Sequence, residues 1–332
     1  MDLFLNDVCQ VSFPGSIVTG ALCVRLPCTD PNEKPTLSAK GFTRIRKPGT
    51  SKENEEYILF FEDTAVLVPK MDSSNLSPIN DDTDYSKIFI FHFVLPNNLP
   101  PSHEVPFGHT RYKITAKFDS NKCKKYFSVN QWVGLEKRND VLVKHAAFSV
   151  SLFNFFHSVK IILNLKQTYY LPGETIFLEA IIKNNSWKDI ILSKIFLIQT
   201  TKYWENLHLL PLKHTRVVAE STRGYIASGS MQVWSQLPLY IPAVIPTTNT
   251  SNNAFNYFDV EYKIKILVKL KNSKKKIIFK QKIFIGNWVM CHDNNEDLNE
   301  TSYEIRFKDC SILETEEIDF IPKYMIYETN LE

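Results

Sequence analysis

The feature that most constrains the fold of this 332-residue chain is the strict alternation of apolar and polar side chains in its clearest segments. Between residues 260 and 270, apolar side chains stand at every second position, and lysine or glutamate fills most positions between them. A period of two is typical of a half-buried β-strand, whereas an amphipathic helix repeats near 3.6 residues. No segment shows three turns of helical periodicity, so we predict an all-β protein. Similar patterns predict further strands at Ile88–Leu95, Arg111–Phe118, Thr175–Ile182 and Lys276–Ile285.

Four landmarks occur twice along the chain in the same order, which predicts two homologous β-sandwiches in tandem. The alternative is that β-sandwich strands look alike by composition alone, which four landmarks in one order disfavour. We place the domains at residues 1–145 and 146–327, followed by a short tail at 328–332. Two of the repeated segments, Pro96–Pro100 and Pro242–Pro246, begin and end with proline, which cannot donate a ladder hydrogen bond in a central strand. We therefore predict that each is a crossover connection that follows a strand. The repeated landmarks are Pro14-Gly15 and Pro172-Gly173, Pro96–Pro100 and Pro242–Pro246, Tyr112–Ile114 and Tyr262–Ile264, and Tyr126–Val129 and Lys282–Ile285.

Composition narrows the class of protein. A hydrophobic content of 44% is enough to build cores and excludes a mainly disordered chain. No apolar run reaches the ~18–20 residues that cross a bilayer, and the acidic start of the chain does not resemble a signal peptide. Six scattered cysteines are typical of reduced thiols rather than a disulfide scaffold. We therefore expect a cytoplasmic protein.

The motifs of common enzyme classes are absent from the sequence. The ten glycines form neither a dinucleotide-binding fingerprint nor a phosphate loop, and no Gly-x-Ser-x-Gly elbow occurs. Cys291 and His292 are adjacent, which does not suit tetrahedral zinc, and Cys23 with Cys28 lacks a second pair. We expect no catalytic residues, no cofactor, no metal and no small-molecule substrate.

The duplicated segments resemble the hallmarks of the α-arrestins, the arrestin domain-containing proteins. The resemblance extends over nearly the whole chain, from about Leu3 to Tyr327. The segments that carry it are Phe91–Ser102, Gly108–Ala116, Tyr170–Ile176, Asn184–Ser186, Leu239–Pro246, Val260–Tyr262 and Ile283–Gly286.

This resemblance implies two arrestin-type, immunoglobulin-like sandwiches, N-terminal-like over 1–145 and C-terminal-like over 146–327, joined by a short hinge. It also implies a non-catalytic adaptor that lies at the plasma membrane or endosomes. Such an adaptor binds cytosolic segments of membrane-protein cargo and steers their ubiquitination, endocytosis or endosomal sorting. The alternative in another class is an arrestin-fold structural subunit of a sorting coat, similar to the one in retromer.

The sequence departs from this family in the features that recruit other proteins. Most α-arrestins bind HECT-type ubiquitin ligases through Pro-Pro-x-Tyr, which is absent here. The nearest match is Ile321-Pro322-Lys323-Tyr324, which lacks the first proline. Pro322 and Tyr324 are therefore either an incomplete ligand for a WW domain or part of the closing segment of the second domain. The first strand region, Leu3–Gln10, holds no basic residue, so we do not expect phosphate sensing in the style of visual arrestins. No cysteine lies between Asn185 and Asn287, which gives no support for a thioredoxin partner.

A cluster of lysines is the clearest candidate for a contact with an anionic surface. It consists of Lys271, Lys274, Lys275 and Lys276, between two predicted strands, so we expect it at a hairpin tip. Such a tip would suit an anionic lipid leaflet or an acidic peptide. The alternative is a solvated turn whose lysines protect a sheet edge from aggregation. Nucleic acid is not expected, because no recognisable module interleaves basic and aromatic residues.

The net charge of +3 conceals a split along the chain. Residues 293–332 hold 12 acidic and 3 basic residues, whereas the preceding residues hold 24 acidic and 36 basic ones. A basic body is therefore followed by an acidic end. Two interpretations follow: the acidic end screens the basic body, or the two parts contact different partners.

Overall fold

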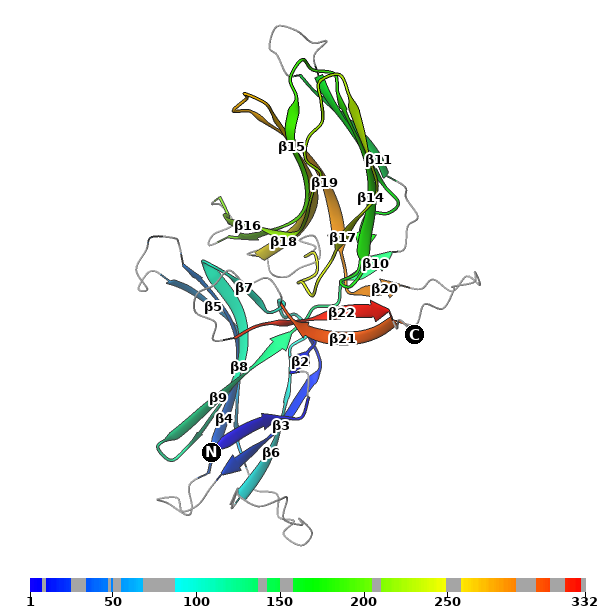
Figure 1. The fold of residues 1–332 in the computed structure, drawn as a ribbon. Coiled ribbons are helices and arrows are strands. Elements are labelled where there is room, and N and C mark those ends of the chain that lie inside the picture. The colour runs from blue at the N-terminus through cyan, green and yellow to red at the C-terminus, as the bar shows by residue number, and fades with distance from the viewer. Residues whose placement is uncertain are drawn as a thin grey trace, which may run out of the picture. The chain divides into compact units, whose positions relative to one another are not determined.

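The computed structural model describes residues 1–7, 10–24, 34–46, 49, 55–67, 87–136, 142–149, 158–204, 210–248, 258–290, 303–310 and 320–329. Every regular element within these ranges is a β-strand, which confirms the all-β prediction (Figure 1). The chain divides into two compact units. Unit 1 comprises Met1–Gln131 and Leu313–Tyr324, and unit 2 comprises Trp132–Ile312 and Met325–Glu332.

Unit 1 is a sandwich of two sheets. The smaller sheet has the order β1 (Asp2–Leu5), β3 (Ile17–Val24) and β6 (Lys87–Val94). The larger sheet has the order β2 (Val11–Ser12), β9 (Asn121–Val129), β8 (Gly108–Phe118), β4 (Thr36–Arg46) and β5 (Glu55–Val66), with β7 (His103–Val105) paired to β8.

Unit 2 is built in the same way. One sheet has the order β11 (Leu142–Ser149), β12 (Ser158–Leu165), β14 (Thr175–Asn184) and β17 (Met231–Tyr240). The other has the order β13 (Tyr169–Tyr170), β19 (Lys276–Ile285), β18 (Phe258–Leu270), β15 (Ile190–Tyr203) and β16 (Leu212–Thr222). Two further pairs are β10 (Gly134–Glu136) with β20 (Trp288–Met290), and β21 (Tyr303–Asp309) with β22 (Lys323–Thr329).

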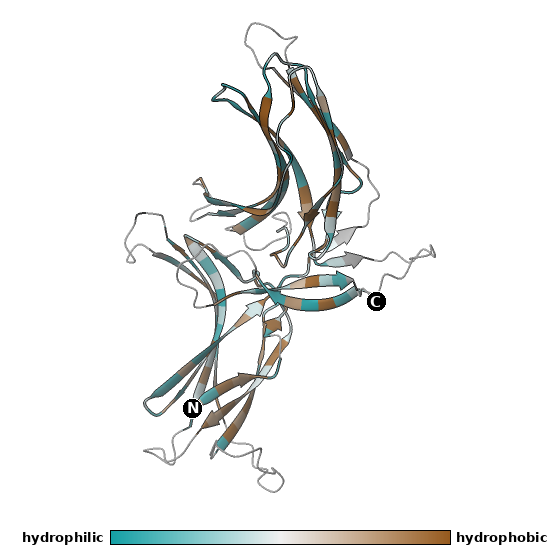
Figure 2. Ribbon diagram, in the orientation of Figure 1, coloured by the Kyte–Doolittle hydropathy of each residue, from teal (hydrophilic) through white to brown (hydrophobic). Residues whose placement is uncertain are grey.

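The alternating pattern places one side of each strand in the core and the other side on the surface. In β18, Tyr262, Ile264 and Ile266 are fully buried, whereas the lysines between them lie on the opposite side of the sheet. Figure 2 shows the resulting succession of hydrophobic and hydrophilic residues along the strands. Burial of each such aliphatic side chain contributes about 1.5–3 kcal/mol, so the alternation itself fixes which face of the sheet points inward.

The two units repeat one topology, as the duplicated sequence landmarks predict. The order β2-β9-β8-β4-β5 in unit 1 corresponds to β13-β19-β18-β15-β16 in unit 2, and β1-β3-β6 corresponds to β12-β14-β17. Even the short edge strands agree, because β2 pairs in parallel with β9 and β13 pairs in parallel with β19. The fold is therefore two tandem β-sandwiches of one topology.

Both proline-rich segments lie outside strands, directly after β6 and β17, which confirms the predicted crossovers. Each crossover is held by the Pro-Gly turn of its own unit. The amide of Gly15 donates to the carbonyl of Pro96 at 3.2 Å, and the amide of Gly173 donates to the carbonyl of Ile241 at 2.7 Å. Both glycines have positive φ, which permits the tight turn at this position.

The boundaries of the two units differ from the predicted domain limits at 145 and 327. Residues 132–145 fall in unit 2, because β10 pairs with β20 and β11 pairs with β12. Residues 313–324 fall in unit 1, although the sequence predicts them in the second domain. The hydroxyl of Tyr324 donates to the carbonyl of Ser102 at 2.8 Å, and the Lys323 amide donates to Ser128 Oγ at 2.8 Å.

Candidate functional site

The outer side of the larger sheet of unit 2 carries a row of lysines, which we call the basic face of unit 2. Three pairs of lysines stand directly opposite each other on the antiparallel strands β18 and β19. They are Lys263 with Lys282, Lys265 with Lys280, and Lys269 with Lys276. The face continues across β15 and β16, where Lys202 lies opposite Lys213. Its full membership is Lys194, Lys202, Lys213, Lys263, Lys265, Lys269, Lys276, Lys280 and Lys282.

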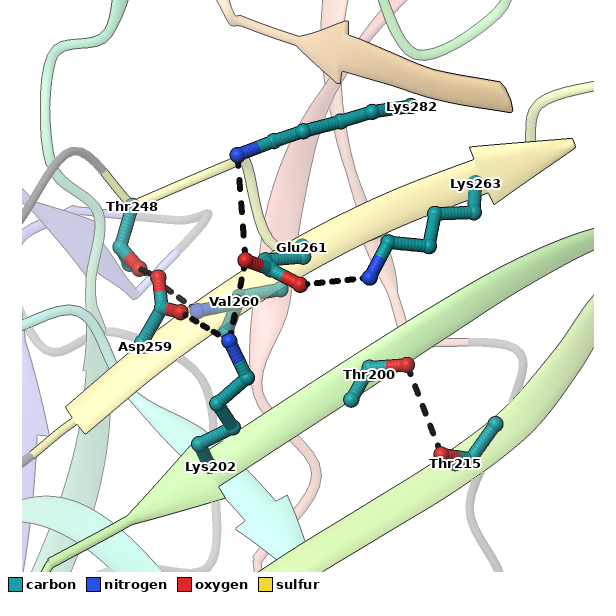
Figure 3. A network of polar contacts seen from close by, with 9 residues as sticks. All are labelled: Thr200, Lys202, Thr215, Thr248, Asp259, Val260, Glu261, Lys263 and Lys282. Carbon is teal, nitrogen blue, oxygen red and sulfur yellow. Dashed lines mark hydrogen bonds and ion pairs between the residues drawn. The ribbon is translucent and has the colours of Figure 1, made fainter. Parts of the chain in front are cut away.

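Glu261, near the start of β18, offsets part of the charge of this face (Figure 3). Glu261 Oε1 lies 2.9 Å from Lys202 Nζ and 3.8 Å from Lys282 Nζ, and its Oε2 lies 2.9 Å from Lys263 Nζ. Burial would raise the pKa of Glu261, but the hydrogen bonds and charges of Lys263 and Lys202 outweigh it and lower the pKa to about 2. Glu261 is therefore ionised at every physiological pH and holds three lysines at one end of the face.

Asp259 extends this network toward the crossover of unit 2. Lys202 Nζ lies 3.1 Å from Asp259 Oδ2, and the Thr248 hydroxyl donates to Asp259 Oδ1 at 3.0 Å. The amide of Val260 in turn donates to Thr248 Oγ1 at 2.6 Å. Lys202 is thus fixed between two carboxylates on a β-ladder, so the network positions this end of the face rigidly.

Lys194 Nζ lies 3.4 Å from Glu220 Oε1, whereas four other lysines of the face have no such compensation. Among the described residues, no carboxylate forms an ion pair with Lys265, Lys269, Lys276 or Lys280. Aromatic rings lie between the ammonium groups instead. Lys265 Nζ lies 5.3 Å from the centre of the Phe196 ring, and Lys282 Nζ lies 5.2 Å from that of Phe284. Like charges directly opposite each other in a ladder are destabilising, so folding stability does not favour this arrangement.

Unit 1 carries a corresponding face on the equivalent sheet. Its members Lys40 and Lys113 stand opposite each other on β4 and β8, and Lys117 stands opposite Lys122 on β8 and β9. Burial lowers the pKa of Lys113, and the surrounding charges of Arg44, Lys40, Lys122 and Lys124 lower it further. The basic face of unit 1 consists of Lys40, Arg44, Lys113, Lys117, Lys122 and Lys124.

Aromatic rings are interleaved with these cations as well. Lys113 Nζ lies 5.0 Å from the centre of the Phe42 ring, and Arg44 Cζ lies 5.6 Å from that of Tyr57. Lys124 Nζ lies 5.4 Å from the Tyr126 ring. Ammonium groups over ring faces combine a positive potential with apolar contact area, which suits a ligand that is acidic and also carries apolar groups.

The predicted lysine cluster lies where the sequence places it, at the tip of the hairpin between β18 and β19. Lys271, Lys274, Lys275 and Lys276 are all exposed there. Lys276 is also the first residue of β19 and pairs with Lys269, so the tip is continuous with the basic face of unit 2. Sequence reasoning missed the strand lysines Lys263, Lys265, Lys280 and Lys282, although their alternating spacing contained the signal.

The second predicted candidate, the incomplete WW-domain ligand, is buried. Tyr324 is only 1% exposed, and Pro322 is buried beside it. The segment would have to leave unit 1 before a WW domain could hold either ring. The acidic residues at positions 314, 316, 317 and 319 and the pair Cys291-His292 lie outside the described residues.

Within the described ranges, no cluster of three or more histidine, cysteine, aspartate or glutamate side chains is arranged to hold a metal ion. The described part of the chain also contains no helix of the length and apolarity that a membrane span requires.

A comparison with family models matches residues 157–288 to the arrestin (or S-antigen) C-terminal domain. The matched residues lie within unit 2 and include both of its main sheets apart from β11. A search of curated proteins found no match to the chain. The chain thus carries an arrestin C-terminal domain, and this match supports its assignment to the arrestin family.

Proposed function

We propose that this protein is a non-catalytic, cytoplasmic adaptor of the α-arrestin type. It binds acidic cytosolic segments of membrane proteins at the plasma membrane or endosomes and steers their ubiquitination, endocytosis or endosomal sorting. The match to an arrestin C-terminal domain supports an adaptor role in general. The observation that carries the proposal is the presence of opposed lysine pairs on equivalent sheets of both units.

The chemistry of the two faces favours an acidic polypeptide over a bare ion. The lysines are spread along several strands rather than gathered around one point, so they match charges distributed along a chain. The phenylalanine and tyrosine rings between them offer contact to apolar side chains of the same segment. Exposed ion pairs contribute about 0.2–1 kcal/mol each, so affinity requires many of them at once and decreases with salt.

Two basic faces on one chain also permit a bivalent mode of binding. An acidic tail that occupies one face is held near the other at a high effective concentration, provided that the linking segment is long enough. Tails with two acidic clusters should therefore bind more tightly than tails with one.

A charge-neutralised variant tests the proposal directly. In Lys265→Gln/Lys269→Gln/Lys276→Gln/Lys280→Gln, four lysines without a described acidic partner lose their charge, so the fold should be unaffected or slightly stabilised. Binding of fluorescent acidic tail peptides, measured by polarisation at low and physiological salt, should weaken about 30-fold, which corresponds to about 2 kcal/mol over four pairs.

The matched control removes the same charge from the other sheet of unit 2. The substitutions Lys144→Gln/Lys160→Gln/Lys166→Gln/Lys183→Gln lie on or next to β11, β12 and β14, away from the basic face. This variant should retain the affinity of the wild type within about threefold. Equal weakening in both variants would show that net charge alone drives binding and would contradict the proposal.

Proximity labelling in cells tests the class of partner. Membrane proteins should be enriched by the wild type and lost with the variant of the basic face. A partner set of only soluble metabolic enzymes would contradict the adaptor role. Stoichiometric co-purification with one large solenoid protein would instead indicate a structural subunit of a sorting coat.

The ligase step of the proposal requires a separate test, because Pro322 and Tyr324 are buried in unit 1. A free peptide of residues 318–327 and the intact chain can be compared for binding to WW domains of HECT-type ligases. Binding of the peptide alone indicates that ligase recruitment depends on release of this segment. Failure of both indicates that any ligase contacts another surface.

A further inference from the structure

A pocket of about 440 Å³ lies in unit 1 beside β9. One side is formed by Lys124, Lys125 and Tyr126 of β9. The other side is formed by residues 320–324, which we call the returning segment because they come back to unit 1 after unit 2. Phe320 and Lys323 of this segment line the pocket. Its volume is within the ~300–1,000 Å³ range of small-molecule sites in proteins.

The charged side chains among the described lining residues of the pocket are all positive. Three of these residues are lysines, and none of the described ones is acidic. The neutral polar groups of Gln10 and Ser128 complete the polar part of the wall. Several lysines around one concave site give it a positive potential, which an anion would relieve.

The returning segment is held firmly enough to define the pocket. The rings of Tyr126 and Phe320 lie with their centres 5.6 Å apart. The Lys323 amide donates to Ser128 Oγ, and the neighbouring Tyr324 is buried with its hydroxyl bonded to the Ser102 carbonyl. These contacts keep Lys323 in the wall of the pocket that Lys124 and Lys125 also line.

We propose that this pocket binds a phosphomonoester, with the phosphate between Lys124, Lys125 and Lys323 and the organic group against the rings of Tyr126 and Phe320. A dianionic phosphate offers several acceptor oxygens to three ammonium donors, whereas a carboxylate offers one charge and two oxygens. The aromatic wall explains why an organic phosphate fits better than the inorganic ion. The phosphomonoester can come from a soluble metabolite or from a lipid headgroup.

Binding at this site has a consequence for unit 1 itself. The ligand would bridge β9 and the returning segment, which are far apart in the sequence. A ligand that binds only when both walls are present stabilises the docked segment by RT ln(1 + L/Kd), where L is its free concentration. The proposal therefore makes attachment of residues 320–324 to unit 1 dependent on the ligand.

Calorimetric titration with phenyl phosphate, inorganic phosphate and benzoate tests the chemistry. Phenyl phosphate should bind most tightly, and Lys125→Gln/Lys323→Gln should weaken it at least about tenfold. Lys117→Gln/Lys122→Gln is the matched control, because it removes two lysines from the same sheet outside the pocket and should bind like the wild type. Hydrogen exchange of residues 320–324 should slow when phenyl phosphate is added to the wild type.

Vesicles distinguish the two sources of the ligand. Phosphatidylcholine vesicles with phosphatidic acid present a phosphomonoester, and vesicles with phosphatidylserine present anionic lipid without one. Preference for phosphatidic acid that is lost in Lys125→Gln/Lys323→Gln assigns a lipid source, and binding of phenyl phosphate alone assigns a soluble one.

Equal binding of benzoate and phenyl phosphate, or equal losses in the pocket variant and its control, would overturn the proposal. So would the absence of binding to phenyl phosphate and to phosphatidic acid alike. Because Lys125 and Lys323 belong to neither basic face, a failure here leaves the proposed adaptor function untouched.

Discussion

Tyr112 and Tyr262 occupy equivalent positions in the two sandwiches, and each donates its hydroxyl to the crossover of its own unit. Tyr112 bonds to the carbonyl of Pro100, and Tyr262 bonds to the carbonyl of Ile245. Both side chains are fully buried. Each tyrosine thereby supplies a donor to a carbonyl of its proline-containing crossover segment.

We expect Tyr112→Phe and Tyr262→Phe to destabilise the chain by about 1–3 kcal/mol each. The ring and its packing are retained, but a buried carbonyl loses its hydrogen bond. Urea unfolding followed by fluorescence measures the effect. The two losses should be additive, because the residues lie in different units. A loss of less than about 0.5 kcal/mol in both variants would contradict the role of the hydroxyl.

Gly173 and Gly224 form a matched pair for testing close backbone approach. Both have positive φ, at 98° and 86°, but only at Gly173 would a Cβ atom meet a neighbour, the carbonyl oxygen of Tyr327 at 1.8 Å. Gly224→Ala should cost about 1–2 kcal/mol from backbone strain alone. Gly173→Ala should cost at least about 3 kcal/mol, because residue 327 must also move away. Thermal unfolding of the two variants gives the comparison, and equal costs would contradict the close contact.

His109 should make the protein sensitive to mild acid. Burial and the charges of Arg111 and Arg44 lower its pKa from 6.5 to about 3, and its cross-strand neighbour Glu104 is bonded to Arg111. The unfolded chain takes up a proton near pH 6.5, whereas the folded chain does not. Stability is therefore lost as the pH falls from about 6.5 toward about 3, by about 1 kcal/mol per pH unit.

The variant His109→Gln should show a shallower loss of stability over that range. Urea unfolding at intervals of pH measures the difference between the two slopes. In the wild type, the proton resonances of the His109 ring should not shift between about pH 7 and pH 4. A titration centred near pH 6.5 would contradict the lowered pKa.

Glu261 should produce an acid dependence at lower pH. Its pKa is lowered from 4.5 to about 2, so its contribution is fully present above about pH 4.5 and is lost as the pH falls toward 2. Glu261→Gln leaves three lysines without their shared carboxylate and should cost about 1–3 kcal/mol at neutral pH. The difference between variant and wild type should shrink on acidification and on addition of salt. A difference that stays constant with pH would contradict the ion-pair network.

The sequence predicts the sheets well because alternation acts over short distances. The pattern around Tyr262 and Ile264 specifies both the strand and its buried face. The prolines at 96 and 242 predict that the preceding strands end before these positions. The hairpin tip at Lys274 follows from the same local rules. The basic face was harder to foresee, because it requires the register that places Lys265 opposite Lys280.

The position of Tyr324 could not be predicted from any local pattern. Its partner Ser102 is 222 positions away, and a short apolar segment near the end of a sandwich suits either domain equally well. The pocket beside β9 depends on that docking, and its lysines at 124, 125 and 323 show no sequence signal that would group them. Long-range packing, rather than propensity, decides where the returning segment attaches.

Attachment of this segment has a consequence for biosynthesis. Lys323 follows Ser128 by 195 positions, so a ribosome that adds about 5–20 residues per second reaches it roughly ten to forty seconds after β9 has been made. During that interval the first sandwich has all its main strands but lacks Tyr324 over Ser102 and one wall of its lysine-lined pocket. The nascent chain therefore exposes a surface that the finished protein covers, and translation of the whole second sandwich sets how long that surface is open.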